Sequence, residues 1–271
     1  MKNYLDPKFD YLLPLKTTCI RIGSKFDGGY IIRKEDINQI EKIVSFGMGQ
    51  NHEDWSFERE FLKKKKVEVV FYDHSVSFHS YISNIFLNLR RFLKFRYKIK
   101  DLYKSIKNLI KYINFINLNE IIHHKKKICL RPKSYSEENP KNIIDNLNNN
   151  KILLKIDIEG SEYEIIDEIL KCHDKIVCIL LEFHNLNTFE NTFEKKIKNL
   201  KTEFEIIHLH GNNYDGTLHT NLPITLEVTL VNKKYLKNLN INTYNYDFPV
   251  KGLDFPNNDQ KPDLAFSFKK Y

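Results

Sequence analysis

The chain has 271 residues, 41% of them hydrophobic, and a formal net charge of +8. Its size suits one large domain or one domain with a substantial insertion, and its charge favours anionic partners: phosphates, nucleotide-sugars, nucleic acid or an anionic membrane surface. No segment approaches the roughly 20 uncharged apolar residues that span a bilayer, and the four cysteines contain no C-x-x-C pair, so we expect free thiols and a cytoplasmic protein.

Residues 1–41 form an N-terminal segment before the first predicted core strand. Its start carries two aspartates and lacks the apolar stretch of a signal peptide. Further along, the sequence RIGSKFDGGYII (residues 21–32) places Asp27, Gly28 and Gly29 between two apolar runs, which is a good tight-turn sequence. We predict a hairpin here, which is either purely structural or a lid with a binding role.

Strands and helices are predicted to alternate from residue 42 to residue 232. Segments rich in β-branched or aromatic residues predict strands at 42–46, 67–72, 151–156, 176–183, 205–209 and 224–231, with a weaker candidate at 126–130. Helical segments lie between most of them, at 54–65, 141–147, 161–172 and 188–200. This alternation predicts an α/β fold with a Rossmann-like, mostly parallel sheet. Only a loop separates the last two strands, which indicates an antiparallel hairpin at one edge.

A long basic segment, about residues 76–125, interrupts this alternation after the second strand and predicts one or two inserted helices. Its cations are Arg90, Arg91, Lys94, Arg96, Lys98, Lys100, Lys104, Lys107 and Lys111, and they interleave with Phe86, Leu89, Phe92, Leu93, Phe95, Leu102, Ile106, Leu109 and Ile110. Such an insertion is either a capping helical hairpin with solvated lysines, a peripheral contact to an anionic membrane, a substrate contact, or a subunit interface.

The first predicted strand leads into the sequence SFGMGQNHEDW, where Gly47 and Gly49 let backbone amides approach a ligand closely. Asp73, at the end of the next strand, is placed to bind the two ribose hydroxyls of an adenosine. A third glycine is missing, and the acids that follow would repel a pyrophosphate. S-adenosylmethionine (SAM) has no phosphate and carries a cationic sulfonium and ammonium. We therefore favour SAM over NAD, with Phe46 and Gln50 as further cofactor contacts.

A second motif, in ILLKIDIEGSEYEIIDEIL (residues 152–170), places two carboxylates at the end of an apolar strand. Asp157 and Glu159 precede Gly160, which opens an amphipathic helix. Ligands of open α/β sheets bind at the carboxyl ends of the strands, so these carboxylates are candidate site residues. The alternative is that they only cap the helix N-terminus.

The segments SFGMGQN, VVFYDHS and LLKIDIEGSEYEII, in this order, resemble class I SAM-dependent methyltransferases of the FkbM-like group. The resemblance extends over residues 21–232, apart from the insertion. It implies a seven-stranded sheet with one antiparallel strand, methyl transfer to oxygen, often on sugars or small metabolites, and S-adenosylhomocysteine (SAH) as product. Arg21 and Asp27 would then pair with the carboxylate and ammonium of the methionine moiety or with an acceptor, beside Gly28, Gly29 and Tyr30.

Polar side chains also follow the later strands, and we predict that they line an acceptor pocket on the same rim as Asp157. They are Glu182, His184, His208, His210, Asn212 and Asn213. O-methylation requires removal of the hydroxyl proton, and a histidine suits this role near neutral pH. His184 is the first candidate base and His210 the second. The same groups are able to hold a divalent metal, but their spacing matches no defined metal motif, so a metal site stays open as the less favoured alternative.

Three alternatives stay open beside an O-methyltransferase for a sugar or another small, anionic acceptor. A nucleic-acid methyltransferase fits the basic charge, but the sequence DIEGSE stands where base-methylating enzymes carry an Asn/Asp-Pro-Pro-aromatic loop. An NAD-dependent oxidoreductase would need the missing glycine. A non-catalytic, membrane-associated protein would use the fold and the inserted helices alone. Residues 233–271 are predicted to be a tail packed on the core, with LAFSF as a short strand or docked segment.

Overall fold

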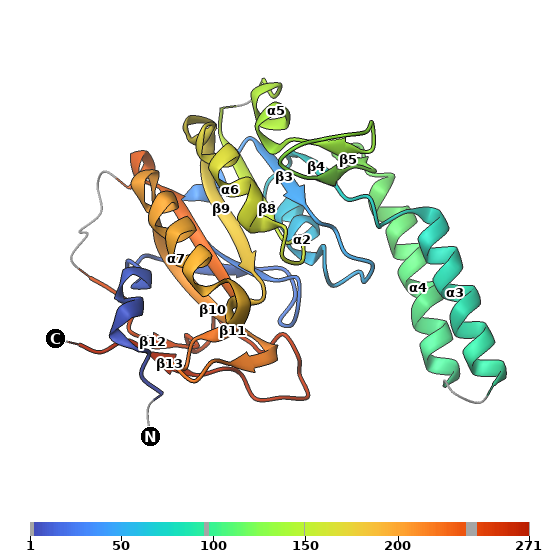
Figure 1. Ribbon diagram of the computed structural model, residues 1–271. Coiled ribbons are helices and arrows are strands. Elements are labelled where there is room, and N and C mark those ends of the chain that lie inside the picture. The colour runs from blue at the N-terminus through green and yellow to red at the C-terminus, as the bar shows by residue number, and fades with distance from the viewer. Residues whose placement is uncertain (1–2, 95–97, 149, 237–242, 271) are drawn as a thin grey trace.

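The computed structural model describes residues 3–94, 98–148, 150–236 and 243–270, so Phe95 and Arg96 of the basic insertion lie outside the described residues. A seven-stranded sheet forms its centre (Figure 1). In spatial order its strands are β10 (Phe204–Thr217), β11 (Pro223–Asn232), β9 (Ile176–Phe183), β8 (Ile152–Ile156), β3 (Lys42–Phe46), β4 (Glu68–Tyr72) and β5 (Ile121–His124). All neighbours pair in parallel except β11, which is antiparallel to both β9 and β10. The predicted fold class and edge hairpin are confirmed.

Helices cover both faces of the sheet, and short strands lie outside it (Figure 1). The helices are α1 (Asp36–Gln39), α2 (Ser56–Lys64), α3 (Phe78–Leu93), α4 (Ile99–Ile116), α5 (Pro140–Asp145), α6 (Glu162–Leu170) and α7 (Leu186–Glu203), with 3-10 turns η1 (Pro7–Leu12), η2 (His173–Lys175) and η3 (Lys233–Tyr235). The short strands form three pairs: β1 (Cys19–Ile22) with β2 (Tyr30–Arg33), β6 (Lys127–Ile128) with β7 (Glu137–Glu138), and β12 (Asp247–Phe248) with β13 (Phe266–Ser267).

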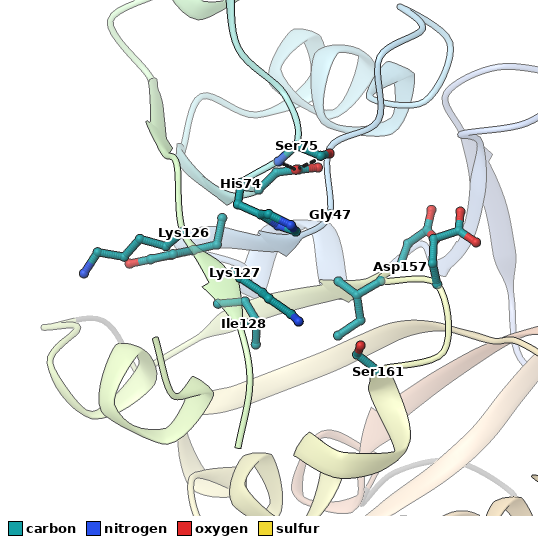
Figure 2. Close-up of a pocket in the computed structure, with 12 residues that line it drawn as sticks. Gly47, His74, Ser75, Lys126, Lys127, Ile128, Asp157 and Ser161 are labelled. Carbon is teal, nitrogen blue, oxygen red and sulfur yellow. Dashed lines mark hydrogen bonds between the residues drawn. The ribbon is translucent and has the colours of Figure 1, made fainter. Parts of the chain in front are cut away.

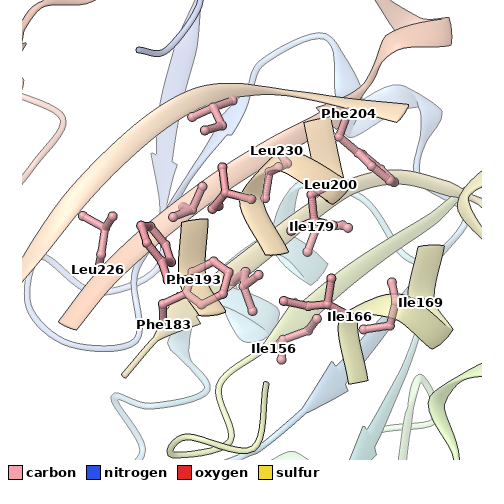
Figure 3. Packing of buried hydrophobic residues seen from close by; sticks show 14 of the residues in the cluster. Ile156, Ile166, Ile169, Ile179, Phe183, Phe193, Leu200, Phe204, Leu226 and Leu230 are labelled. Atoms are coloured by element: carbon pink, nitrogen blue, oxygen red, sulfur yellow. The ribbon is translucent and has the colours of Figure 1, made fainter. Parts of the chain in front are cut away.

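Two apolar cores sandwich the sheet. On one face, α5, α6 and α7 pack against the central strands, as Ile166, Phe193 and Leu200 show (Figure 3). On the other face, α2, α4 and the β1–β2 hairpin bury the second core. Every residue of β8 and β9 is buried, which is why their sequences are nearly continuous apolar runs. Within the described residues, no helix combines the length and apolar character needed to cross a bilayer.

The third strand of the sheet is not where the sequence indicated it. The weaker candidate at 126–130 contributes only the two-residue strand β6, which pairs with β7 and not with the main sheet. The sheet ends instead with Ile121–His124, which pairs with β4 alone. An edge strand needs no continuous apolar run, and its sequence IIHH is buried only at Ile121. The inserted helices therefore end at Ile116, and the predicted insertion to residue 125 includes one strand of the core.

Candidate cofactor and acceptor site

Two adjoining cavities open at the carboxyl ends of β3, β4 and β8. The first has a volume of about 260 Å³ and is lined by Gly47, Tyr72, Asp73, His74, Ser75, Lys126, Lys127, Ile128, Asp157, Ile158, Glu159 and Ser161. In Figure 2, His74 and Lys127 point toward its middle. The second has a volume of about 330 Å³ and is lined by Asp27, Gly28, Gly47, Gly49, Asn51, Asp54, Asp73, Ser75, Asp157 and Glu159. Because the two share five residues, they form one elongated site.

The glycine turn after β3 is closely packed. Gly47 has φ +90° and Gly49 has φ +73°, a left-handed conformation that side chains rarely adopt. A Cβ on Gly47 would overlap the carbonyl oxygen of Asp157, and one on Gly49 would overlap the Asp54 carboxylate. The absence of a side chain at both positions therefore lets the turn lie directly against the strand end that carries Asp157.

Asp73 holds the loop after β4. Its Oδ1 accepts hydrogen bonds from the Ser75 N–H (2.7 Å), the Ser75 hydroxyl (2.7 Å) and the Val76 N–H (3.2 Å), and its Oδ2 accepts one from the Met48 N–H (2.8 Å). Burial opposes ionisation, but these hydrogen bonds outweigh it and lower the pKa of Asp73. Each carboxylate oxygen has about two acceptor positions, and the Met48 N–H takes one of those on Oδ2. One position on Oδ2 is left for a ribose hydroxyl, whereas the sequence led us to expect that Asp73 binds both hydroxyls.

The second cavity is strongly acidic. All five ionisable residues that line it are acids: Asp27, Asp54, Asp73, Asp157 and Glu159. Burial is the largest factor that raises the pKa of Asp27, and the charges of Asp157 and Glu227 add to it. Burial likewise raises the pKa of Asp54 to about 7, with the charges of Asp27 and Asp157 in the same direction. Such a cavity repels phosphate and favours a cation.

A buried ion pair between Lys155 and Glu58 lies next to the acidic cavity. Lys155, on β8, is 1% exposed, and Glu58, on α2, is fully buried. The Lys155 Nζ lies 3.5 Å from Glu58 Oε1, donates to the Asp54 carbonyl oxygen at 3.1 Å, and lies 5.0 Å from the centre of the Tyr30 ring. The Tyr30 hydroxyl in turn donates to Asp157 Oδ2 at 3.4 Å. The pair thus connects three parts of the site that are distant in sequence.

His184, which follows β9, lies among four carboxylates. Its Nε2 is 3.8 Å from Asp157 Oδ1, 3.7 Å from Glu159 Oε2 and 4.0 Å from Glu182 Oε1. Its Nδ1 is 3.3 Å from Glu162 Oε1. Burial disfavours the imidazolium, but the hydrogen bond with Glu162 and the charges of Glu182 and Asp157 outweigh it and raise the pKa of His184 to about 10. In the ligand-free protein, His184 therefore holds a proton at neutral pH.

Asp157, Glu182 and His184 also have the donor set of a divalent-cation site. One ligand atom from each lies within 4.8 Å of the others. Glu182 is 3% exposed; its Oε1 accepts from the Asn212 side chain at 2.8 Å. Of the predicted acceptor residues, Glu159, Glu182, His184 and Asn212 therefore come together beside Asp157.

Three further predicted acceptor residues instead hold the C-terminal tail. The His208 Nε2 lies 2.7 Å from Asp254 Oδ1, and the His210 Nε2 lies 3.2 Å from Asp263 Oδ1. Asn213 donates to three carbonyl oxygens of residues 258–262 and accepts from the Asn258 N–H.

Burial disfavours the imidazolium of His210, but the charges of Glu227 and Asp263 raise its pKa to about 10. His210 therefore stabilises the docked tail as a cation. Of the three histidines predicted for the acceptor pocket, only His184 therefore remains beside Asp157.

The remaining predicted residues have mixed positions. Asp27 and Gly28 line the second cavity. Gln50 and Gly29 line neither cavity, and Phe46 is fully buried beneath the turn. The Arg21 guanidinium donates to the carbonyl oxygens of Ser24 and Phe26 and so closes the β1–β2 turn. Arg21 therefore does not line the acidic cavity, whereas Asp27 does.

Sequence reasoning missed several residues of the site. Asp54 belongs to the segment QNHEDW and Glu162 belongs to the segment DIEGSE, but the sequence analysis predicted no site role for either residue. Glu162 Oε2 accepts from the Gly160 N–H at 2.7 Å, and its Oε1 accepts from the His184 N–H at 2.7 Å. A carboxylate in the first turn of a helix that follows a site strand was the available signal. No pattern indicated that Lys127 faces the first cavity.

Comparisons with known proteins show what the chain is similar to. Residues 94–215 match the family model of the methyltransferase FkbM domain. The match includes Asp157, Glu182 and His184, but neither the glycine turn nor Asp73. Two similar solved structures are a fibrillarin pre-rRNA processing protein of Methanococcus jannaschii (8% identity, 73% of this chain and 68% of that chain covered, TM-score 0.39) and the 23S rRNA methyltransferase ErmE (12% identity, 74% and 68% covered, TM-score 0.35). No curated protein sequence matches the chain.

Proposed function

We propose, from the match of residues 94–215 to the methyltransferase FkbM domain, that this protein transfers the methyl group of SAM to a hydroxyl of a sugar or another small, anionic acceptor. The sugar belongs to a surface glycan or is a nucleotide-sugar precursor. The observation that carries the proposal is the acidic second cavity beside the glycine turn. It fits a ligand with a sulfonium and an ammonium, and it does not fit a pyrophosphate.

The two cavities divide the cofactor between them. The first, with Lys127 and Ile128 on its wall, receives the adenosine, and Asp73 Oδ2 accepts one ribose hydroxyl. The second receives the methionine end among Asp27, Asp54 and Asp157. SAM supplies an electrophilic methyl group on a cationic sulfur. Holding the two reactants in line supplies a large part of the acceleration in such a transfer.

His184 removes the proton from the acceptor hydroxyl. A new bond forms between oxygen and methyl carbon, the carbon–sulfur bond breaks, and the proton moves to His184 Nε2. In the ligand-free protein this imidazole is already protonated, because it balances the carboxylates around it. With a cation held beside Asp157, that proton is no longer needed for charge balance. The pKa of His184 then falls, and Nε2 accepts the hydroxyl proton.

The docked tail favours a small acceptor over a polynucleotide. The Asn257 side chain donates to Glu227 Oε1 at 2.7 Å and lies 3.5 Å from Asp27 Oδ1. The tail therefore borders the acidic cavity and reduces the space that an acceptor would occupy beside it.

Transfer of radiolabelled methyl from SAM tests the proposed acceptor class. The purified protein is incubated with labelled SAM and either a set of sugars and nucleotide-sugars or total RNA. We expect label in the sugar fraction, in a product that resists the mild alkali that cleaves methyl esters. Label in RNA, with none in the sugars, would select the nucleic-acid methyltransferase. The non-catalytic alternative requires no transfer to any acceptor.

Removal of divalent metal is expected to leave methyl transfer unchanged. The reason is that neutral His184 accepts the hydroxyl proton itself, and before SAM binds its imidazolium supplies the positive charge beside Asp157 and Glu182. The assay compares the initial rate after exhaustive EDTA treatment with that of untreated protein. A rate that falls at least tenfold and returns with Mg²⁺ or Mn²⁺ would instead assign these side chains to a metal that lowers the pKa of the acceptor hydroxyl.

SAM affinity is expected to rise by about fivefold between pH 6 and pH 8, the change for one carboxylate whose pKa falls by about one unit on binding. Asp54, with a pKa of about 7, is mostly neutral below this range and mostly ionised above it. Asp27, Asp157 and Lys155 are the charged groups that face it. Folding raises the pKa of Asp54. The contribution of Asp54 to the folding stability of the ligand-free protein is therefore lost as the pH rises through 7. Affinity for a cation rises over the same range.

Calorimetry at several pH values measures this dependence. Asp54→Asn should flatten the pH dependence of SAM affinity, and SAH, which lacks the sulfonium charge, should show a smaller change than SAM. An equal pH dependence in the Asp54→Asn protein would contradict the role of Asp54.

A further inference from the structure

The hairpin of α3 and α4 extends well beyond the sheet (Figure 1). The helices have 16 and 18 residues, which correspond to lengths of about 24 and 27 Å. Only the inner half is anchored to the body. There the Phe115 ring stacks on Trp55 at 4.2 Å, and the Asn108 Oδ1 lies 2.9 Å from His52 Nδ1. Apart from Arg91, the described residues of the outer half, between 86 and 107, make no hydrogen bond, ion pair or ring contact to the rest of the domain.

The two helices meet along a polar seam. The Asn88 side chain donates to the Ser105 hydroxyl at 2.7 Å and to Asn84 at 3.3 Å. Asn88 and Ser105 are 7% and 8% exposed, although both are polar. A hairpin that is stable in water normally buries its apolar side chains between its helices. Here the buried positions of the outer half are polar.

Exposed apolar side chains run along the outer faces of both helices. On α3, Phe86, Leu89 and Leu93 repeat at i, i+3 and i+7; on α4, Ile99, Tyr103, Ile106 and Ile110 repeat at i, i+4, i+7 and i+11. Phe86, Leu93, Ile99 and Tyr103 are each more than 65% exposed. In all, nine of the seventeen exposed large hydrophobic residues in the described part of the chain lie on these two helices. Apolar surface at this density indicates a contact that the isolated chain does not make.

The same hairpin is strongly basic. Its described cations are Arg90, Arg91, Lys94, Lys98, Lys100, Lys104, Lys107 and Lys111, and its only acid is Asp101. The tip combines both properties, since Leu93 and Ile99 stand beside Lys94, Lys98 and Lys100. Two copies of this surface would repel each other. At the tip, Leu93 and Ile99 also offer no flat face on which nucleic-acid bases stack.

We propose that the α3–α4 hairpin docks the protein on an anionic lipid bilayer. The exposed apolar side chains near the tip enter the boundary between headgroups and acyl chains, and the lysines and arginines bind the anionic headgroups. The polar seam stays between the helices, where its partners are satisfied. This docking does not depend on the proposed methyl transfer, and it would place the site near acceptors that are held at a membrane.

Flotation with lipid vesicles tests the proposal on the full chain. Vesicles of phosphatidylcholine are compared with vesicles that contain about 30% phosphatidylglycerol, at low and high salt. We expect binding to the anionic vesicles only, with at least a tenfold loss in 0.5 M NaCl, because salt screens the headgroup contacts. Equal binding to neutral vesicles, or no binding to either, overturns the proposal.

Two hairpin variants and one control complete the design. The first variant combines Phe86→Ser, Leu93→Ser and Ile99→Ser; the second combines Lys94→Glu, Lys98→Glu and Lys104→Glu; the control combines Tyr4→Ser, Tyr135→Ser and Tyr244→Ser at exposed positions elsewhere. Both hairpin variants should lose at least tenfold in vesicle binding with unchanged circular dichroism and SAM affinity, and the control should bind like the parent protein. Light scattering that shows a dimer which the first variant dissociates, or a gel shift of RNA that the second abolishes, overturns the membrane assignment.

Discussion

A Gly47→Ala protein is expected to bind SAM about 10- to 100-fold more weakly than the parent protein. Gly47 lies where the two cavities meet, and its added Cβ would overlap the Asp157 carbonyl oxygen. The Cβ is bonded directly to the backbone and the carbonyl oxygen is part of it, so neither atom is able to rotate away. Relief requires that the turn after β3 move away from the end of β8. Overpacking of this kind costs about 1–3 kcal/mol, and the movement separates the Asp157 carboxylate from the backbone amides of the glycine turn.

Gly216→Ala is the matched control for this substitution. Gly216 has φ +89°, against +90° for Gly47, but no atom lies within 4 Å of its added Cβ. Both variants therefore bear the same left-handed strain of about 1–2 kcal/mol, and only Gly47→Ala adds the overlap. Calorimetric titration with SAM gives both affinities. If Gly216→Ala weakens SAM binding as much as Gly47→Ala, the close approach to Asp157 is not the cause.

Lys155→Met is expected to lower the free energy of unfolding by about 3–5 kcal/mol, because it leaves Glu58 buried without its cation. Glu58 has no exposed surface, accepts one hydrogen bond at Oε1 from the Ser45 hydroxyl, and has no partner at Oε2. Loss of Lys155 also removes the donor to the Asp54 carbonyl oxygen. Denaturant unfolding measures the stability, and calorimetry should show weaker SAM binding in the folded variant.

A second variant separates the buried charge from the lost packing. Lys155→Met with Glu58→Gln removes both charges and should recover most of the lost stability, since a pair replaced by neutral groups is often nearly neutral in stability. Lys198→Met is the control, because the Lys198–Glu194 pair on α7 is exposed and contributes less than about 1 kcal/mol. A double variant as unstable as the single one would show that Lys155 acts through packing alone.

Buried, regular elements were predictable because their sequences carry the pattern directly. The strands at 42–46 and 176–183 match β3 and β9 in both bounds, since each is an apolar run flanked by turn or helix signals. The third strand was misplaced because Ile121–His124 pairs on one side only and shows no such run. The inserted helices were foreseen from their period, but the polarity of their seam depends on which faces meet, and that follows from packing.

The site was predictable at the strand ends and less so elsewhere. Asp73, Asp157 and His184 follow directly from strand boundaries, because the carboxyl ends of parallel strands share one edge. His208 and His210 were assigned to the site by the same reasoning from strand order. Their actual partners, Asp254 and Asp263, lie about 50 residues downstream in an irregular tail. No local spacing indicates such a pairing. The Lys155–Glu58 pair was also missed, because it joins β8 to α2 and no local spacing indicates a contact between elements so far apart in sequence.

Calorimetric titration of the purified protein with SAM, SAH and NAD tests the central claim most directly, because it needs no acceptor. The acidic cavity and the glycine turn predict that SAM and SAH bind at one site with dissociation constants of about 1–100 µM, and that NAD gives no heat of binding. Binding of NAD in place of SAM, or no binding of SAM to folded protein, would contradict the assignment of this site to a methyl donor.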